Sequence, residues 1–338
     1  MTVPAKPPLL RILAANAIAL VVFAIVAGII LEVFCRTVID DGMRFEFEMW
    51  RYAREVKISR PDPRLPFVHR PGARARVMGA EVVTNSLGLR EEREIDLNPD
   101  PAVTRILMLG DSVTFGFGVE QHETTSAQLE AQLAAAGRRV EVLNAGVGNY
   151  NTAMEVEAYL TERRGLKPDL VVLNFFVNDA EPTPVPRGNI LTRSSLAAVY
   201  FNNRVDSVAR WTNGAPGWEQ YYTDLFNESA PGWQQARQAI QALHRSCTED
   251  GRRLAIVNYP DLHQTNPYPL TVITDRIRQV AATLGVPFLD LTPEVTQQSD
   301  AALLWVNGGD PHPNAATHAK YARRIAEWLR QGPLLDRD

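Results

Sequence analysis

The chain has 338 residues, of which 45% are hydrophobic and 22% are charged, and its formal net charge is −4. This composition is ordinary for a folded protein, and the length allows at most two domains, or one domain with additions. The acidic balance argues against nucleic-acid binding, which requires a basic face. With two cysteines and no Cys/His spacing typical of zinc, we expect no disulfide framework, no metal and no cofactor.

The first expected element is a transmembrane helix. Residues 12–31 (ILAANAIALVVFAIVAGIIL) carry no charge and one polar side chain, Asn16. As a helix this run is roughly 30 Å long, the thickness of a bilayer core. Lys6 and Arg11 precede it, which predicts a cytoplasmic N-terminus and an exported remainder.

A cleaved signal peptide is the alternative for this segment. Its apolar region would normally be shorter and would end in a small-residue cleavage site. Here the sequence continues as Glu32-Val33-Phe34-Cys35-Arg36. We therefore predict that residues 1–36 form a cytoplasmic tip and a single-pass anchor in the inner (cytoplasmic) membrane, with the rest of the chain on the periplasmic or extracellular side.

Residues 37–103 are expected to form a stalk and a small preface segment. Four prolines interrupt regular structure here, namely Pro61, Pro63, Pro66 and Pro71. A short helix or strand is expected near Phe45–Trp50, and residues 85–90 (NSLGLR) have the composition of a turn.

Residues 104–332 alternate between short apolar runs and helical patterns. Strands are expected at 106–109, 140–143, 170–176, 254–257 and 286–289, and helices at 123–136, 152–164, 233–250, 270–284 and 315–330. Such alternation indicates a parallel sheet covered on both faces. The expected fold class is α/β, a three-layer α/β/α domain with about five parallel strands.

Residues 181–230 break this alternation. They contain several Pro, Gly and Asn residues, and their aromatic residues include Trp211, Trp218, Tyr221 and Tyr222. We interpret this stretch as an insertion or long loop system, because long loops in compact domains often act as lids or binding loops. The aromatic side chains either stack on sugar rings or pack the loop.

A candidate nucleophile and a candidate base lie at opposite ends of the domain. Ser112, in Gly110-Asp111-Ser112, follows the first strand and precedes a helix. His312, in Asp310-Pro311-His312, lies in the segment that leads into the last helix. A serine nucleophile requires a general base, usually histidine, and a carboxylate orients that imidazole. Ligands of parallel sheets collect beyond the carboxyl ends of the strands, where Ser112 lies.

Two further segments follow strands at the same edge. Residues 144–152 (NAGVGNYNT) contain glycines that let backbone N–H groups face a ligand. Asn178, after the third strand, has an amide that can donate to an oxyanion. For each segment taken alone, a plain turn is the favoured interpretation. His263, in Asp261-Leu262-His263 after the fourth strand, either lines the pocket or has a structural role.

Together these motifs resemble the SGNH hydrolases, or GDSL-like esterases, over about residues 104–332. Gly110-Asp111-Ser112 matches the nucleophile block, Asn178-Asp179 the asparagine block, and Asp310 with His312 the closing block. Three positions differ from the family pattern. Asn149 stands where the second block has glycine, Phe176 stands where the third block has glycine, and Asp310 precedes His312 by two residues rather than three.

The resemblance implies an acyl-enzyme mechanism with Ser112 as nucleophile, His312 as base and Asp310 as its partner. The N–H groups of Ser112 and of Gly148 or Asn149, with the Asn178 amide, would form the oxyanion hole. The implied function is that of a membrane-anchored esterase or O-acyltransferase acting on acylated, in particular acetylated, envelope or extracellular glycans. The transferase version would require a membrane acyl-donating partner protein. A non-catalytic glycan-binding or assembly subunit and a lipase or thioesterase are the alternatives.

Overall fold

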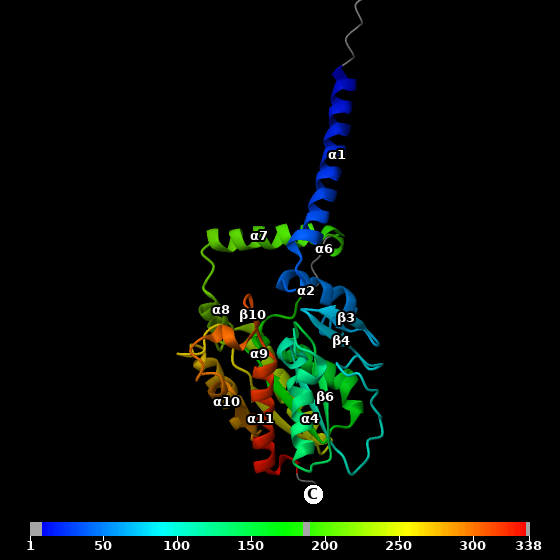
Figure 1. Cartoon of the computed structure of the whole chain (residues 1–338). Helices are drawn as coiled ribbons and strands as arrows, with labels where there is room; N and C mark the ends of the chain where they lie inside the picture. Colours follow the sequence, from blue (N-terminus) through cyan, green and yellow to red (C-terminus); the bar gives the residue numbers. More distant parts are fainter. Residues whose placement is uncertain (1–8, 185–189, 336–338) are drawn as a thin grey trace, which may run out of the picture. The chain divides into compact units, whose positions relative to one another are not determined.

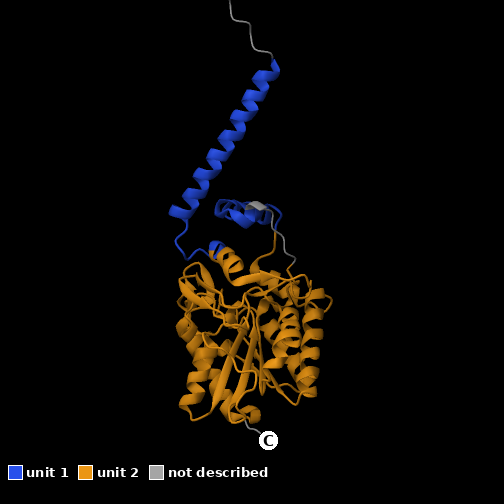
Figure 2. Ribbon diagram, turned by 90° about the vertical axis from the view of Figure 1, so that its right-hand side faces the viewer, with its two compact units in different colours: residues 1–47, 187–214 blue, residues 48–186, 215–338 orange. Residues whose placement is uncertain are grey.

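The computed structural model describes residues 9–184 and 190–335 (Figure 1). The chain divides into two compact units (Figure 2). Unit 1 comprises residues 1–47 and 187–214, and unit 2 comprises residues 48–186 and 215–338. The stretch that the sequence marks as an insertion is thus shared between the two units.

Unit 2 is built on a parallel sheet of five strands in the order β6-β5-β7-β8-β9. The strands are β5 (Thr104–Gly110), β6 (Val140–Gly146), β7 (Leu170–Phe175), β8 (Arg253–Asn258) and β9 (Phe288–Asp290). Strands β5 and β7 are buried at every residue, as expected of a sheet covered on both faces. The expected α/β class with five parallel strands is confirmed.

Helices cover the two faces of this sheet and form two apolar cores. One core joins the sheet to α5 (Thr152–Ala158), α9 (Pro231–Glu249) and α10 (Thr271–Leu284). The other joins it to α4 (Thr125–Ala135) and α11 (Ala315–Gln331). The amphipathic pattern of α11 explains its place, because Tyr321, Ile325 and Leu329 recur at four-residue intervals and are all buried.

The preface segment is more regular than the sequence suggests. Helix α2 (Phe45–Arg51) continues into a π-helical turn at Tyr52–Val56. Two antiparallel ladders follow, β1 (Lys57–Ser59) with β2 (Phe67–His69), and β3 (Arg74–Val77) with β4 (Ala80–Val83). The prolines at 61, 63 and 66 lie in the connection between β1 and β2, which explains why the strands themselves were not apparent.

Unit 1 contains the apolar helix α1 (Leu9–Phe34), which has no buried residue. Together with the π-helical turn Cys35–Ile39 it is the one helix in the described residues that is long and apolar enough to span a membrane. Helix α7 (Leu196–Thr212) belongs to the same unit and follows the short α6 (Ile190–Ser194).

The expectation of a long loop at 181–230 is wrong over most of its length, because α6, α7 and α8 (Trp218–Leu225) are helical. Pro182 and Pro184 precede α6, Gly214 and Gly217 lie between α7 and α8, and Pro231 begins α9. Residues 185–189 of this stretch lie outside the described residues.

Candidate active site

Ser112 begins the short helix α3 (Ser112–Phe115) directly after β5. The carboxylate of Asp111 accepts a hydrogen bond from the Val113 N–H at 2.8 Å and so caps this helix. Strand β6 approaches closely, since a Cβ atom on Gly146 would lie 2.3 Å from the Phe115 nitrogen. Glycine at 146 therefore allows the ends of β5 and β6 to meet around Ser112, whose side chain is nearly buried.

The predicted nucleophile, base and carboxylate form one hydrogen-bonded chain. The Ser112 Oγ lies 2.8 Å from Nε2 of His312, and Nδ1 of His312 lies 2.5 Å from Oδ1 of Asp310. The His312 backbone N–H also donates to this Oδ1, at 3.0 Å. Because an ionised carboxylate only accepts, Nδ1 carries the proton and Nε2 is free to accept from Ser112.

The two-residue spacing between Asp310 and His312 therefore permits the contact that the family pattern makes with a spacing of three. Both residues lie in β11 (Asp310–Pro313), which pairs with β10 (Trp305–Asn307). Asp310 is 1% exposed, while His312 retains 15% exposure of its side chain. The carboxylate is thus shielded from water, and the imidazole remains reachable.

Asn178 lies beside the nucleophile turn. Its Nδ2 donates to Oδ2 of Asp111 at 2.9 Å, which leaves its second amide hydrogen for another acceptor. Burial raises the pKa of Asp111, while its bonds from Val113 and Asn178 favour the ionised form. Asp111 therefore links the turns that follow β5 and β7.

A pair of buried carboxyl groups supports the turn that carries Asn178. Asp179 accepts a hydrogen bond from the Phe176 N–H at 3.0 Å, and the buried carboxyl group of Glu155 interacts with it electrostatically. Burial raises the pKa of both groups well above the usual range, and the nearby Asp111 charge adds to the effect. Burial therefore favours the protonated form of this pair, because two adjacent buried carboxylates would repel each other.

The loop after β6 places its two predicted oxyanion donors differently. The Gly148 N–H donates to the Tyr52 hydroxyl at 2.8 Å, and a Cβ atom on Gly148 would lie 2.7 Å from the Tyr52 ring. Asn149 has φ of 66°, a left-handed conformation that suits glycine and is tolerated best by asparagine and aspartate among other residues. Asn149 therefore adopts a backbone conformation that glycine would also adopt without strain.

Tyr52 connects this loop to a buried histidine of the preface. Its hydroxyl lies 2.6 Å from Nε2 of His69, whose Nδ1 lies 3.1 Å from the Gly88 carbonyl. A carbonyl only accepts, so Nδ1 donates and Nε2 accepts from Tyr52. Burial lowers the pKa of His69 to about 3, which keeps the imidazole neutral. The Tyr52 hydroxyl can therefore accept a hydrogen bond from the Gly148 N–H and at the same time donate one to Nε2 of His69.

Lys57 also contacts this loop. Its Nζ donates to the Gly148 carbonyl at 2.5 Å and to Oδ1 of Asn149 at 2.9 Å. The rings of Tyr52 and Phe67 lie within 4.4 Å and 4.2 Å of Nζ. Burial lowers the pKa of Lys57 well below its usual range. The loop conformation at Asn149 is thus fixed by side chains of the preface.

Arg90 supports the nucleophile turn in a comparable way. It is fully buried, and its guanidinium donates to the carbonyl groups of Phe115, Gly116 and Val119. Burial lowers its pKa to about 10, so it stays charged at neutral pH. No sequence motif marks Tyr52, Lys57, His69 or Arg90 as site residues. Arg90 lies only in the expected turn 85–90.

His263 repeats the local arrangement of His312. Its Nδ1 lies 2.9 Å and 3.0 Å from the two carboxylate oxygens of Asp261, which raise its pKa. Its ring stacks on Trp218 at 5.0 Å and 24°, and meets Trp305 edge-on at 6.4 Å. Trp305 pairs with Pro313, the residue after His312, so this aromatic cluster borders the strand that carries the candidate base.

The sequence also highlights Trp211, Tyr221 and Tyr222 in the 181–230 stretch. Tyr222 packs against the core, and the Tyr221 hydroxyl donates to Glu181 at 2.9 Å. Trp211 is 83% exposed on α7 of unit 1. Of the four, only Trp218 is therefore placed near the Asp261–His263 pair by a ring contact.

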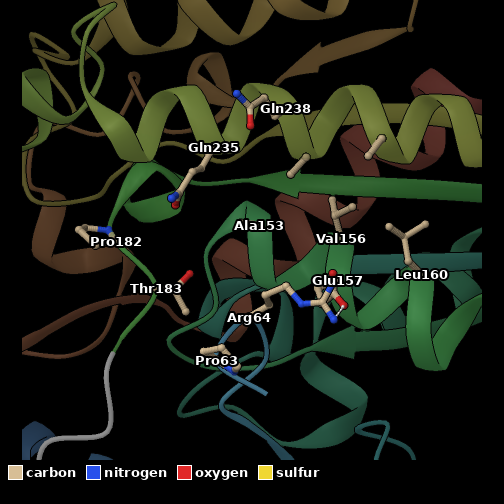
Figure 3. Close-up of a pocket in the computed structure, with 12 residues that line it drawn as sticks. Pro63, Arg64, Ala153, Val156, Glu157, Leu160, Pro182, Thr183, Gln235 and Gln238 are labelled. Atoms are coloured by element: carbon tan, nitrogen blue, oxygen red, sulfur yellow. Dashed lines mark ion pairs between the residues drawn. The ribbon is translucent and has the colours of Figure 1, made fainter. Parts of the chain in front are cut away.

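A separate hollow of about 570 Å³ lies between α5, α9 and the connection after β1 (Figure 3). Arg64 and Glu157 form an ion pair of 3.1 Å across it, and Gln235, Gln238 and Thr183 line it. None of its lining residues belongs to the predicted site. This hollow is therefore distinct from the Ser112 site.

The geometry around Ser112 suits acyl transfer. A serine hydroxyl bonded to a carboxylate-held imidazole can attack a carbonyl carbon, with donors nearby for the oxyanion. Three of the predicted residues, Ser112, His312 and Asp310, are joined by hydrogen bonds. Asn178 is linked to the residue before Ser112, whereas the Gly148 N–H is engaged by Tyr52.

Comparison with solved structures finds several matches at low identity, each with a TM-score below 0.5. The protein titled TesA is 15% identical with a TM-score of 0.46, covering 68% of this chain and 99% of that one. The acetyl xylan esterase AlAXEase is 14% identical with a TM-score of 0.43, covering 67% and 99%. A mutant of an acetyl-xylooligosaccharide esterase from Geobacillus Stearmophilus is 16% identical with a TM-score of 0.45, covering 70% and 95%.

No curated protein sequence matches this chain. A family model does match residues 108–320, which is more than half of the chain and runs from β5 into α11. Its description is the GDSL-like lipase/acylhydrolase family. The match encloses Ser112, Asn178, Asp310 and His312. The chain belongs to the GDSL-like lipase/acylhydrolase family and is a hydrolase of ester bonds.

Proposed function

We propose that this protein is a membrane-anchored serine esterase or O-acyltransferase that acts on acetylated envelope or extracellular glycans. The observation that carries the catalytic part is the hydrogen-bonded chain from Ser112 through His312 to Asp310. Residues 104–332 supply the hydrolase domain, and residues 37–103 the stalk and preface. Residues 1–36 supply the cytoplasmic tip and a single pass through the inner membrane, with the catalytic domain on the outer side.

The reaction begins when Oγ of Ser112 attacks the ester carbonyl carbon and passes its proton to Nε2 of His312. The carbonyl π pair moves to oxygen, which becomes the oxyanion of a tetrahedral intermediate. Collapse of the intermediate expels the alcohol, which takes the proton from His312. Water, or a sugar hydroxyl in a transferase, then attacks the acyl-enzyme by the same steps and restores Ser112.

For the oxyanion hole we choose Asn149 rather than Gly148 as the donor from the β6 loop. The Gly148 N–H is donated to Tyr52, and Lys57 holds the loop in its left-handed turn at Asn149. The Ser112 N–H and the second amide hydrogen of Asn178 complete the set. Loss of one such donor typically lowers the rate by about a hundred- to a thousandfold.

The glycan substrate is supported by the aromatic cluster beside the candidate base. Trp218 and Trp305 flank His263, and all three are partly exposed. Aromatic rings of this kind present flat apolar faces with polar edges, which suit sugar rings. An acyl-donating membrane protein would be the partner of the transferase version, and the apolar helix α1 would hold the enzyme at the same membrane.

A non-catalytic glycan-binding or assembly subunit is the second candidate, because a shared fold does not guarantee activity. The Ser112–His312 contact weighs against it. A lipase or thioesterase remains the third, and an apolar acyl tunnel at Ser112 would favour it over an open cleft.

Purified full-length protein distinguishes these candidates. We expect hydrolysis of p-nitrophenyl acetate and release of acetate from acetylated glycans, both lost in Ser112→Ala. Mass analysis of Ser112 after addition of a donor would identify the trapped acyl group. Equal activity of the wild type and Ser112→Ala would disprove the proposed mechanism, and a trapped long acyl chain would favour the lipase or thioesterase.

A further inference from the structure

An apolar stripe runs along α7 of unit 1. Phe201, Val205 and Val208 are 47%, 66% and 59% exposed, and Trp211 near the end of the helix is 83% exposed. Steps of four and three residues place the first three on one side of the helix, at about 100° per residue. Among the described residues outside α1, the other exposed large apolar side chains are scattered singly.

The opposite side of α7 is polar. Asn202 donates to Asp206 at 3.0 Å, and the Ser207 hydroxyl donates to the Asn203 carbonyl at 2.7 Å. Arg210 lies on this side as well, about 180° from Phe201 at the same angular step. When a helix has one polar side and one exposed apolar side, the apolar side indicates a surface that binds a partner or enters a membrane.

A third side of α7 contacts the segment that follows α1. The Tyr200 ring packs on Phe47 at 6.2 Å, and Arg204 pairs with Glu46 at 3.5 Å. By helical geometry these residues lie about a quarter turn or less from the stripe. The stripe is therefore not the part of α7 used for packing within unit 1.

The N-terminus of α7 is held at the end of the apolar run of α1. Glu32, the first charged residue after that run, accepts hydrogen bonds from the Ser195 hydroxyl at 2.7 Å and from the Leu196 and Ala197 N–H groups at 3.2 Å and 3.0 Å. If residues 12–31 fill the bilayer core, Glu32 lies at headgroup depth. The start of α7 then lies at the same depth.

The direction of α7 relative to α1 also fits a position at the membrane surface. Figures 1 and 2 show it running crosswise to α1 within unit 1. A helix crosswise to a membrane-spanning helix, and tied to its end, lies along the membrane surface. Interfacial helices combine an apolar side with a polar side, and tryptophan is enriched at the membrane–water interface.

We propose that α7 is an interfacial helix that lies in the lipid surface, with Phe201, Val205 and Val208 in the boundary between headgroups and acyl chains and Trp211 at headgroup level. The inference rests on the proposed anchor, since it places α7 by its bonds to the end of α1. It adds a second membrane contact to the single spanning helix. The partner is the bilayer itself, because the helix that carries the stripe begins at the end of the apolar run of α1.

Site-specific fluorescent labels test this proposal in the full-length protein reconstituted in lipid nanodiscs. Val208→Cys and Asp206→Cys form a matched pair, since both sites are exposed and lie on nearly opposite sides of one turn. Ile18→Cys reports on the anchor independently. The wild type, treated with the same dye, measures background from Cys35 and Cys247, which are both buried. Circular dichroism checks that each variant is folded.

We expect the label at 208 to shift its emission to the blue, to resist aqueous iodide and to be quenched by lipid-borne spin labels. A quencher near the headgroups should act more strongly on it than one at the acyl-chain ends, because interfacial helices enter only about 5–10 Å. The label at 206 should remain accessible to iodide, and the label at 18 should be quenched best by the deep spin label.

Three results would overturn the inference. If the labels at 206 and 208 are equally accessible to iodide while that at 18 is quenched by lipid, α7 is not interfacial and the anchor stands. If no label is quenched by lipid, the anchor fails as well. If the label at 208 resists iodide without lipid quenching, and Val208→Cys forms a disulfide between copies, the stripe is a protein interface.

Discussion

Two Asp-x-His pairs follow the same design and differ in what the histidine touches. In both, the carboxylate accepts from Nδ1 and from the backbone N–H of the histidine two residues later. Nε2 of His312 lies 2.8 Å from the Ser112 hydroxyl, whereas the ring of His263 stacks on Trp218. An oriented imidazole is therefore not by itself a general base; the group at its second nitrogen decides its chemistry.

The two pairs should differ most in the loss of esterase activity that follows removal of the imidazole. His312→Ala should lower esterase activity on p-nitrophenyl acetate by roughly ten-thousandfold or more, since the attacking hydroxyl loses its proton acceptor. His263→Ala should reduce activity on this small ester far less. Steady-state kinetics of the two folded variants measures the contrast, and similar losses in both would abolish the distinction between the pairs.

Removal of the carboxylate charge should also lower kcat far more in the Asp310–His312 pair than in the Asp261–His263 pair, but by a smaller factor than removal of the imidazole. Asp310→Asn should lower kcat by roughly a thousand- to ten-thousandfold, because the amide favours the wrong imidazole tautomer and cannot stabilise its charged form. Asp261→Asn serves as the matched control, with little change of kcat on the same ester. A wild-type kcat in Asp310→Asn would show that the short spacing between Asp310 and His312 does not serve catalysis.

Loss of the contact between the preface and the β6 loop should lower kcat more moderately. Tyr52→Phe removes the hydroxyl that accepts from Gly148, leaves that N–H unpaired and loosens the turn at Asn149. We expect kcat to fall by about tenfold to a hundredfold, since an unpaired buried donor costs roughly 1–3 kcal/mol. Arg60, which is exposed and pairs with Glu162, offers a control in Arg60→Ala.

Equal activity of Tyr52→Phe and the wild type would mean that the loop holds its shape without the preface. In contrast, a drop in kcat without a change in KM would assign Tyr52 a positioning role, because the oxyanion forms only in the transition state.

The smallest expected effect is on the pH dependence of stability. Asp261 raises the pKa of His263, so the folded state binds the proton more tightly than the unfolded state. This stabilisation is fully present below the unfolded pKa of about 6.5 and is lost as the pH rises through the higher folded value.

Asp261→Asn should therefore lose stability relative to the wild type at low pH and less at high pH. Denaturant unfolding at several pH values measures the difference, and NMR titration of His263 should show a lower pKa in the variant. A pH-independent difference would attribute the effect of Asp261 to packing or neutral hydrogen bonds.

Much of the fold and of the Ser112 site could be predicted from the sequence because the signals are local. Continuous apolar runs mark β5 and β7 as buried on both faces, and each chemical motif directly follows a strand or opens the last helix. Parallel strands then bring these motifs to one edge, so chain order and strand polarity suffice to place Ser112 near His312.

The support of the site could not be predicted, because it depends on contacts between distant parts of the chain. Lys57 is 91 residues from Gly148, and its burial could not be inferred from a short strand broken by prolines. The Gly148 N–H donates to Tyr52, which is 96 residues away in the chain. Because the sequence does not reveal this contact, it could not distinguish Gly148 from Asn149 as the oxyanion donor. Helix α7 was missed because the prolines and glycines at its flanks suggested a loop.

The central claim is that Ser112 is a nucleophile activated by His312. The most direct measurement is labelling of the full-length protein with a fluorophosphonate probe, followed by mass spectrometry of its peptides. We expect a covalent adduct on Ser112 in the wild type and in His263→Ala, and strongly slowed labelling in His312→Ala. An unlabelled Ser112, or labelling that is equally fast without His312, would contradict it.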